Sequence, residues 1–307
     1  YPWWGWKDGT MTKAEIRRLK AVADDLGITL VPQFNVFGHA SMSRGQSGKH
    51  AVLDLNREYQ PLFEPHHGWN WCLSNPEAQK VVDGLVVEMH EAFGNPPYFH
   101  IGCDEATDPT CSLCRAGDYR QTVASFVTEI HDALKSRNCR SMVWHAMFFD
   151  SGAKSWCPSL VKPGAKEQGK FMEMIPNDLV MCYYAYDKPK EGTGAWPGAV
   201  ALQKKGFPTV LCPWEHREGV YGQAKYIRET GLLGLLMTTW HHIPLSATHF
   251  FENGARATWE KHDGRPLELL NPHTAAHHLR TVGWDVPNRG YRDTGWWKSQ
   301  IPAEVTR

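Results

Sequence analysis

Apolar residues recur at helical spacing through the first ordered stretch of the sequence and then merge into a short continuous run. Ile16, Leu19, Val22, Ala23 and Leu26 follow the helical period. The preceding Thr12-Lys-Ala-Glu15 is a capping box, and Gly27 is a typical stop signal. The run at 28–35 has the length and β-branched content of a buried strand. The pattern therefore predicts a helix over 13–26 and a strand over 28–35.

The same cycle then recurs along the chain. Ser74-Asn-Pro-Glu77 caps a second helix that ends at Gly94, and a strand follows over 98–103. Further strands are predicted at 141–147, 179–184, 209–213 and 232–239, with helices at 119–136, 198–205, 220–230 and 246–259. Alternating strands and helices favour a parallel sheet with helices outside it. We expect one α/β domain over 1–259, with 260–307 as a C-terminal helical or irregular appendage packed on it.

Ionisable and aromatic residues gather where the predicted strands end. In a (β/α)8 TIM barrel, the carboxyl-terminal edge of the strands carries the active site. Random core filling would spread such residues along the strands, so this placement favours an enzyme. The residues at or just past predicted strand ends are His39, Asp104, Glu105, Trp144, His145, Tyr183, Tyr184, Trp214, Glu215, Trp240 and His241.

Composition narrows the choice of partner. Lys plus Arg and Asp plus Glu both number 33 among 307 residues, so the zero formal charge argues against nucleic acid. The longest apolar runs fall short of a membrane span. The 14 tryptophans suit sugar binding, because flat aromatic faces pack on sugar rings, although core filling explains them equally well. No cofactor is predicted.

The eight cysteines are scattered rather than arranged as a disulfide framework. Together with the absence of Asn-x-Ser/Thr sites, this favours a reducing compartment such as the cytoplasm. Cys111-Ser-Leu-Cys114 has the spacing of half a structural zinc site or of a redox pair, but a second Cys-x-x-Cys is missing. A closed zinc site needs four ligands, so two loop thiols without metal are the preferred interpretation, and metal binding stays open as the alternative.

Asp104 and Glu105 directly follow an apolar strand. A nearby like charge raises the pKa of one carboxyl group, which suits a general acid beside an ionised neighbour. The alternative is a solvated acidic turn, but Gly102 and the apolar strand before it make that the weaker interpretation.

The segment His100-Ile-Gly-Cys-Asp-Glu105 resembles the His-x-Gly-Gly-Asp-Glu signature of glycoside hydrolase family 20, closest to the hexosaminidase D-like branch, which also has Cys at the second Gly. The resemblance extends to Val31-Pro-Gln-Phe-Asn-Val-Phe-Gly-His39, Met142-Val-Trp-His145 and Leu235-Leu-Met-Thr-Thr-Trp240. It implies a retaining exo-β-N-acetylhexosaminidase on a TIM barrel, acting on glycans with terminal GlcNAc or GalNAc. Family 20 chemistry is substrate-assisted, with an oxazolinium intermediate and no enzyme nucleophile.

The resemblance also implies roles for individual residues. Glu105 would be the acid and base, and Asp104 would hold the acetamide N–H. Trp144 and Trp240 would wall the sugar pocket, and His39 would support the acid pair, although a structural histidine is nearly as good an interpretation. Trp214 is grouped with the substrate-binding residues, and Tyr184 is preferred over Tyr183 and Tyr186 as the acetamide partner. Because His241 replaces the family's Glu, the acidic ligand of the outer hydroxyls is unassigned between Glu215 and Asp187.

Two other functions stay open. A barrel glycosidase with a carboxylate nucleophile would need a partner for Glu105 such as Glu215, and a glycan-binding protein would keep the aromatic pocket without turnover. Strand counting by the family pattern makes 28–35 the third barrel strand and 232–239 the eighth. We therefore expect strands one and two to come from an upstream segment, a second chain or a swapped partner in a homodimer.

Overall fold

The computed structural model describes residues 11–41, 57–65, 68–149, 170–186, 195–214 and 217–240. Helix α1 (Lys13–Asp25) begins at the predicted capping box, because Thr12 accepts a 3.2 Å hydrogen bond from the Glu15 N–H and donates its own N–H to Glu15 Oε2 at 2.7 Å. Gly27 follows with φ +67. The prediction of a first helix is confirmed, with its end one residue earlier.

The described chain divides into two compact units. The first extends to Cys182 and includes Lys204–Pro208, and the second comprises Tyr183–Gln203 with the described residues from Thr209 onward. The predicted helix 246–259 and appendage 260–307 lie outside the described residues. The one-domain division at residue 259 therefore stays a prediction.

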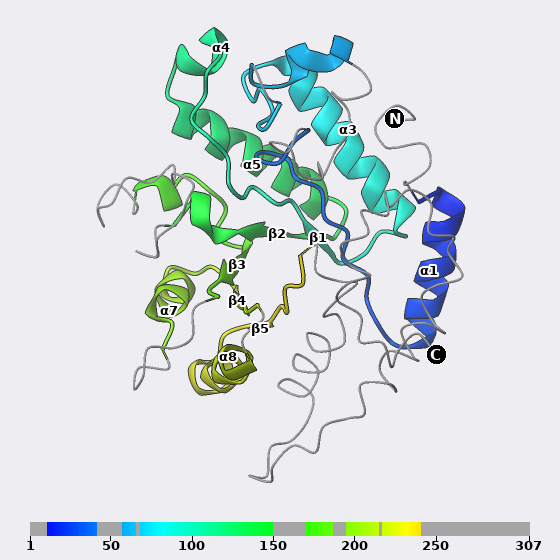
Figure 1. Cartoon of the computed structure of the whole chain (residues 1–307), viewed down its shortest axis with the longest axis vertical. Coiled ribbons are helices and arrows are strands. Elements are labelled where there is room, and N and C mark those ends of the chain that lie inside the picture. Colours follow the sequence, from blue (N-terminus) through cyan, green and yellow to red (C-terminus); the bar gives the residue numbers. More distant parts are fainter. Residues whose placement is uncertain are drawn as a thin grey trace, which may run out of the picture. The chain divides into compact units, whose positions relative to one another are not determined.

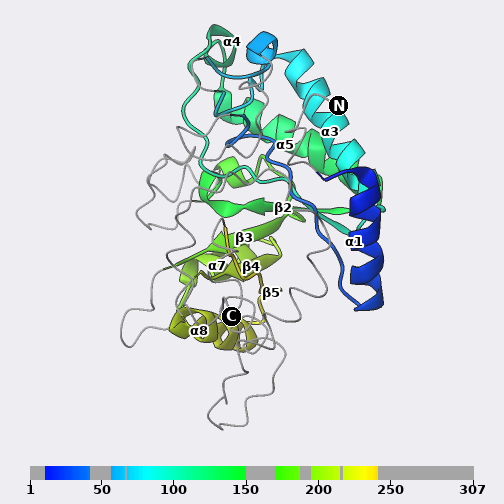
Figure 2. The ribbon, with the colours of Figure 1, turned by 45° about the vertical axis from the view of Figure 1, so that its right-hand side comes forward.

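The first unit is built on parallel strands covered by helices. Strand β1 (Tyr98–His100) pairs in parallel with β2 (Arg140–Trp144), and β2 pairs with β3 (Val180–Tyr184). Helices α3 (Pro76–Ala92) and α5 (Tyr119–Lys135) lie side by side, and α5 packs on β2 (Figure 1 and Figure 2). The buried faces of these two helices carry mainly aliphatic side chains. The predicted parallel α/β arrangement is confirmed for these elements.

The segment 28–35 differs from the predicted strand. It is extended beside β1 and exchanges hydrogen bonds with it, from the Phe34 N–H to the His100 carbonyl at 2.9 Å and from the His100 N–H to the Pro32 carbonyl at 2.9 Å. Only the pair Gln33 and His100 forms a bridge. Pro32 has no N–H to donate, which shortens the ladder.

Short elements connect the helices and strands of this unit. They are the 3-10 helix η1 (Arg57–Leu62), the single turn α4 (Ser112–Arg115) and the 3-10 helix η2 (His145–Met147). η2 starts where the predicted strand 141–147 would have continued, so β2 ends at Trp144. Aromatic side chains fill the core between these elements, including Phe34, Phe37, Trp71, Phe99 and Phe126.

The second unit repeats the strand and helix cycle. Helix α7 (Pro197–Lys204) precedes strand β4 (Thr209–Cys212), and helix α8 (Arg217–Thr230) precedes β5 (Gly234–Leu235), which pairs in parallel with β4. The predicted strand 232–239 is thus two residues long, although Thr238 still hydrogen-bonds to the Pro213 carbonyl at 3.0 Å. Among the described helices, none is long and apolar enough to cross a membrane.

Candidate active site

Asp104 and Glu105 lie on a sharply bent segment that leaves the end of β1. The Ile101 N–H donates to the Met142 carbonyl, and the Trp144 N–H donates to the Gly102 carbonyl, so β1 and β2 stay joined up to the bend. Gly102 and Glu105 then have φ values of +72 and +53. This left-handed backbone turns the chain so that Asp104 is buried while Glu105 is partly exposed.

His39 faces both carboxylates of the pair. Its Nε2 lies 2.8 Å from Glu105 Oε2 and 3.4 Å from Asp104 Oδ2. The residue has φ +56, and the neighbouring Gly38 has no room for a Cβ, which would come within 2.8 Å of the Ala106 amide nitrogen. The predicted residues His39, Asp104 and Glu105 are therefore brought together, and a single imidazole can hydrogen-bond to both acids.

Asn35 supports the buried member of the pair. Its side-chain amide lies 3.4 Å from Asp104 Oδ1, and its own oxygen accepts a 3.0 Å hydrogen bond from Gln33. A Cβ on Gly102 would approach Asn35 Cα to 2.9 Å, so glycine is required by this close contact as well as by its φ. The contact explains why Gly102 precedes the acid pair.

Residues 101–111, between β1 and α4, form the acid-pair loop. The segment 69–71 holds this loop, and reasoning from the sequence missed it. Trp69 Nε1 donates to the Glu105 carbonyl at 2.6 Å, and its ring lies 4.2 Å from that of His39. Asn70 makes a two-point contact with the main chain of Thr107, donating at 2.7 Å and accepting at 3.1 Å. Only the unusual density of tryptophan in this segment hinted at such a role.

Trp144 ends β2 and is almost fully buried, at 2% exposure. Its ring lies 4.4 Å from that of His100, whose Nδ1 accepts a hydrogen bond from the Gly102 N–H at 3.0 Å. The next residue, His145, is also buried, and burial lowers its pKa to about 3 despite the nearby Cys182 carbonyl. His145 is therefore neutral at physiological pH, and contact of Trp144 with a sugar stays a prediction.

The predicted aromatic residues of the second unit form a cluster of their own. Tyr186 stacks on Tyr184 at 5.5 Å and meets Trp214 and Trp240 edge-on at 5.4 and 6.3 Å. Tyr183, by contrast, is buried with its hydroxyl against Gly198. The geometry separates Tyr183 from the other two tyrosines, which share one aromatic surface. Glu215, Asp187 and His241 lie outside the described residues.

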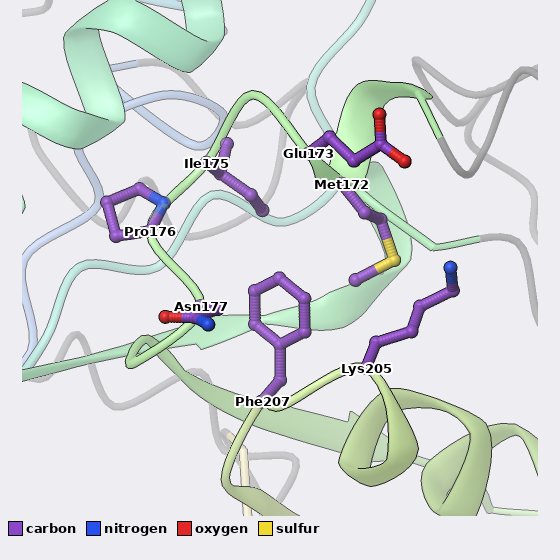
Figure 3. Close-up of a pocket in the computed structure, with 7 residues that line it drawn as sticks. All are labelled: Met172, Glu173, Ile175, Pro176, Asn177, Lys205 and Phe207. Carbon is purple, nitrogen blue, oxygen red and sulfur yellow. The ribbon is translucent and has the colours of Figure 1, made fainter.

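A pocket of about 540 Å³ lies in the first unit, and none of the predicted site residues lines it. It is lined by Met172, Glu173, Ile175, Pro176, Asn177, Lys205 and Phe207 (Figure 3). These residues precede strands β3 and β4, so the pocket lies at the amino-terminal ends of the strands. In α/β barrels that edge serves stability, whereas catalysis uses the other edge.

Comparison with known proteins gives an independent view of the chain. Residues 5–182 match glycosyl hydrolase family 20, catalytic domain. A similar solved structure is the exo-β-N-acetylglucosaminidase of Vibrio harveyi in complex with N-acetylglucosamine, with 17% identity and a TM-score of 0.58. A β-N-acetylhexosaminidase of Bacteroides fragilis has 17% identity and a TM-score of 0.55, and the chitobiase of Flavobacterium johnsoniae has 19% and 0.51.

These similarities extend over most of the chain but only part of each relative. The matches cover 89%, 95% and 89% of this chain and 45%, 56% and 41% of the Vibrio, Bacteroides and Flavobacterium chains. The chain thus spans about half the length of these relatives. At such identities the structural matches show a shared fold, and the parallel strands with covering helices agree with the (β/α)8 barrel of that family.

Proposed function

Because the chain belongs to glycosyl hydrolase family 20, we propose that it is a glycosidase that removes terminal N-acetylhexosamine residues from glycans. The observation that carries this proposal is the contact of His39 Nε2 with Glu105 Oε2 at 2.8 Å and Asp104 Oδ2 at 3.4 Å. Two adjacent acids that differ in burial and share one imidazole suit a division of labour between proton transfer and substrate orientation.

In this reaction the substrate supplies the nucleophile. Asp104 accepts a hydrogen bond from the N–H of the 2-acetamido group and aligns its carbonyl oxygen with the anomeric carbon. The bond from that oxygen to the anomeric carbon forms as the glycosidic C–O bond breaks, and Glu105 gives its proton to the leaving oxygen. An oxazolinium ion results, and the configuration has inverted once.

The second step restores the acid and the configuration. Glu105, now a carboxylate, takes a proton from water, whose oxygen attacks the anomeric carbon and breaks the bond to the oxazolinium oxygen. The sugar leaves with net retention. His39 is a positioning residue in this scheme, because it touches both carboxylates and sets which oxygen of Glu105 faces the substrate.

The sugar itself needs an apolar wall and polar partners around its hydroxyls. From the family resemblance we assign a sugar-stacking role to each of Trp144, Trp214 and Trp240, the acetamide contact to Tyr184, and hydroxyl binding to Glu215 or Asp187. The edge-on contacts of Tyr186 with both Trp214 and Trp240 support a shared aromatic surface around Tyr184. Aromatic faces of this kind bind the apolar faces of sugar rings.

A chromogenic assay tests the proposal with the full chain. We expect release from aryl β-N-acetylglucosaminide or β-N-acetylgalactosaminide and almost none from the matched aryl β-glucoside, because the glucoside lacks the acetamide nucleophile. Equal cleavage of the acetamido sugar and the glucoside would favour a carboxylate nucleophile instead. Binding of N-acetylglucosamine without turnover of any substrate would favour a glycan-binding protein.

A further inference from the structure

Three thiols and a carboxylate converge beside the acid-pair loop. Cys72 Sγ lies 3.6 Å from Cys111 Sγ and 3.8 Å from Cys114 Sγ, and Glu64 Oε1 lies 3.3 Å from Cys111 Sγ. All four ligand atoms fall within 4.8 Å of one another. Two of the residues come from the Cys-x-x-Cys motif, and the other two come from a segment about 40 positions earlier in the sequence.

The separations match those of a tetrahedral metal site. With zinc–sulfur bonds of about 2.3 Å and tetrahedral angles, two thiolate sulfurs lie about 3.8 Å apart. A disulfide would require about 2.05 Å, and the three thiols are separate here. The odd number of cysteines also leaves one thiol over from any disulfide within the cluster.

Glu64 is a buried acid at 4% exposure. Its Oε2 accepts hydrogen bonds of 2.8 Å from the N–H groups of both Thr110 and Cys111. Its other oxygen, Oε1, faces the thiols. In the part of the chain that the structure describes, no lysine, arginine or histidine pairs with Glu64. Buried charges are paired or coordinate a metal, so a cation held between Glu64 and the thiols would balance this charge.

We propose that Glu64, Cys72, Cys111 and Cys114 bind a zinc ion. Three thiolates and one carboxylate give the zinc the same formal charge balance as a four-cysteine site. The Cys114 N–H donates to Cys111 Sγ at 3.2 Å, a hydrogen bond that orients and stabilises a thiolate ligand. A sulfur-rich tetrahedral set excludes magnesium and calcium, which bind oxygen ligands.

The ion joins two segments that hold the acid pair. Cys72 lies two residues after Asn70, and Trp69 and Asn70 contact Glu105 and Thr107. The Cys72 N–H also donates to the Leu62 carbonyl at 3.0 Å. Cys111 and Cys114 lie at the other end of the acid-pair loop. With all four positions taken by protein ligands, the zinc is structural rather than catalytic.

Metal analysis tests this proposal independently of glycosidase activity. The full chain is expressed with zinc, purified under reducing conditions without chelator, and analysed for metal per polypeptide. We expect about one zinc per chain, as for one closed four-ligand site. Cobalt bound in place of zinc should give the thiolate charge-transfer band and the intense visible bands of a tetrahedral site, a readout that needs no variant.

Matched variants locate the ion. Glu64→Gln and Cys111→Ser should lose most of their zinc on dialysis, whereas Glu58→Gln, at an exposed position of η1, and Cys139→Ser, outside the cluster, should keep it. Zinc absent from the wild-type chain even after titration would overturn the proposal. So would zinc retained by Glu64→Gln and Cys111→Ser alike, or a disulfide from Cys72 found in the reduced preparation by mass spectrometry.

Discussion

The indole N–H of Trp69 donates to the main-chain carbonyl of Glu105 at 2.6 Å. This hydrogen bond fixes the backbone of the proposed acid from outside the strand that carries it. The same indole packs against His39, so one side chain holds both the acid and the histidine that faces it.

Trp69→Phe should therefore lower kcat more than it raises KM. The loss of one hydrogen bond costs about 0.5–1.5 kcal/mol, which corresponds to roughly a two- to tenfold drop in rate. Steady-state kinetics on an aryl N-acetylhexosaminide measure this drop in kcat. Trp196→Phe is the control, because that tryptophan packs against Tyr226 in the other unit. An unchanged kcat in Trp69→Phe would contradict the positioning role of Trp69.

The two acids should respond differently to substitution. Glu105→Gln removes the proton donor, so turnover should fall by about 10²–10⁴-fold on substrates with poor leaving groups and much less on activated aryl glycosides. Asp104→Asn impairs the acetamide nucleophile and should slow both substrate types alike. Turnover like that of Glu129→Gln, an exposed control on α5, in either variant would refute the assignment.

Glycine substitutions test the close packing under the acid pair. Gly38→Ala places a Cβ against the Asp104 carbonyl and within 2.8 Å of the Ala106 nitrogen, while Gly102→Ala places one 2.9 Å from Asn35 Cα. Backbone cannot yield cheaply, so each should cost about 1–3 kcal/mol in the free energy of unfolding, with activity lost in parallel. Gly117→Ala has open space around its Cβ and should be neutral in urea denaturation.

The buried histidines should make stability fall in acid. Burial lowers the pKa of His145 to about 3 and also lowers that of His131, where Asp178 partly opposes the effect. An unfolded histidine takes up a proton near pH 6.5, so the unfolded chain binds more protons between about 6.5 and 3. Stability is complete above that window and is lost as the pH falls through it, by up to about 1.4 kcal/mol per pH unit for each histidine.

Urea denaturation from neutral pH to about pH 4.5 measures this dependence. His145→Gln removes one of the two titrations, so its stability should decline less steeply than that of the wild type, whatever its stability at neutral pH. A variant with the same slope as the wild type would show that His145 takes up no extra proton on unfolding.

Local patterns in the sequence predicted the local structure well. The capping box at Thr12, the predicted cap within Ser74–Glu77 and the stops at Gly27 and Gly94 mark helix ends, because capping depends only on nearby residues. In the structure the residue that caps the second of these helices is Asn75. The strand at 28–35 was overpredicted, because apolar content does not report how much of a ladder forms beside Pro32. Similarly, the helical periodicity located α1 but did not predict which of its apolar side chains are buried, since Leu26 is 58% exposed.

Contacts between distant segments could be predicted from the sequence only in part. His39 beside Asp104 and Glu105 followed from strand ends that share one edge, but the hold of Trp69 on Glu105 depends on an irregular segment with no period to read. The prediction that Cys111 and Cys114 are ordinary loop thiols rested on the missing second pair. The fold brings Cys72 and Glu64 to them, so the ligand count changed only when the loop was seen in three dimensions.

The left-handed backbone at Gly102, Cys103 and Glu105 means that the acid pair cannot be moved as a short motif. Each of the two non-glycine residues there costs about 1–2 kcal/mol relative to ordinary conformations. That free energy is supplied by neighbours that include Asn35 and the segment 69–71. If the six residues from His100 to Glu105 were grafted onto another barrel, the sequence of the site would be present but its loop would relax to ordinary backbone conformations. The two carboxylates would then lose the orientation that they have here.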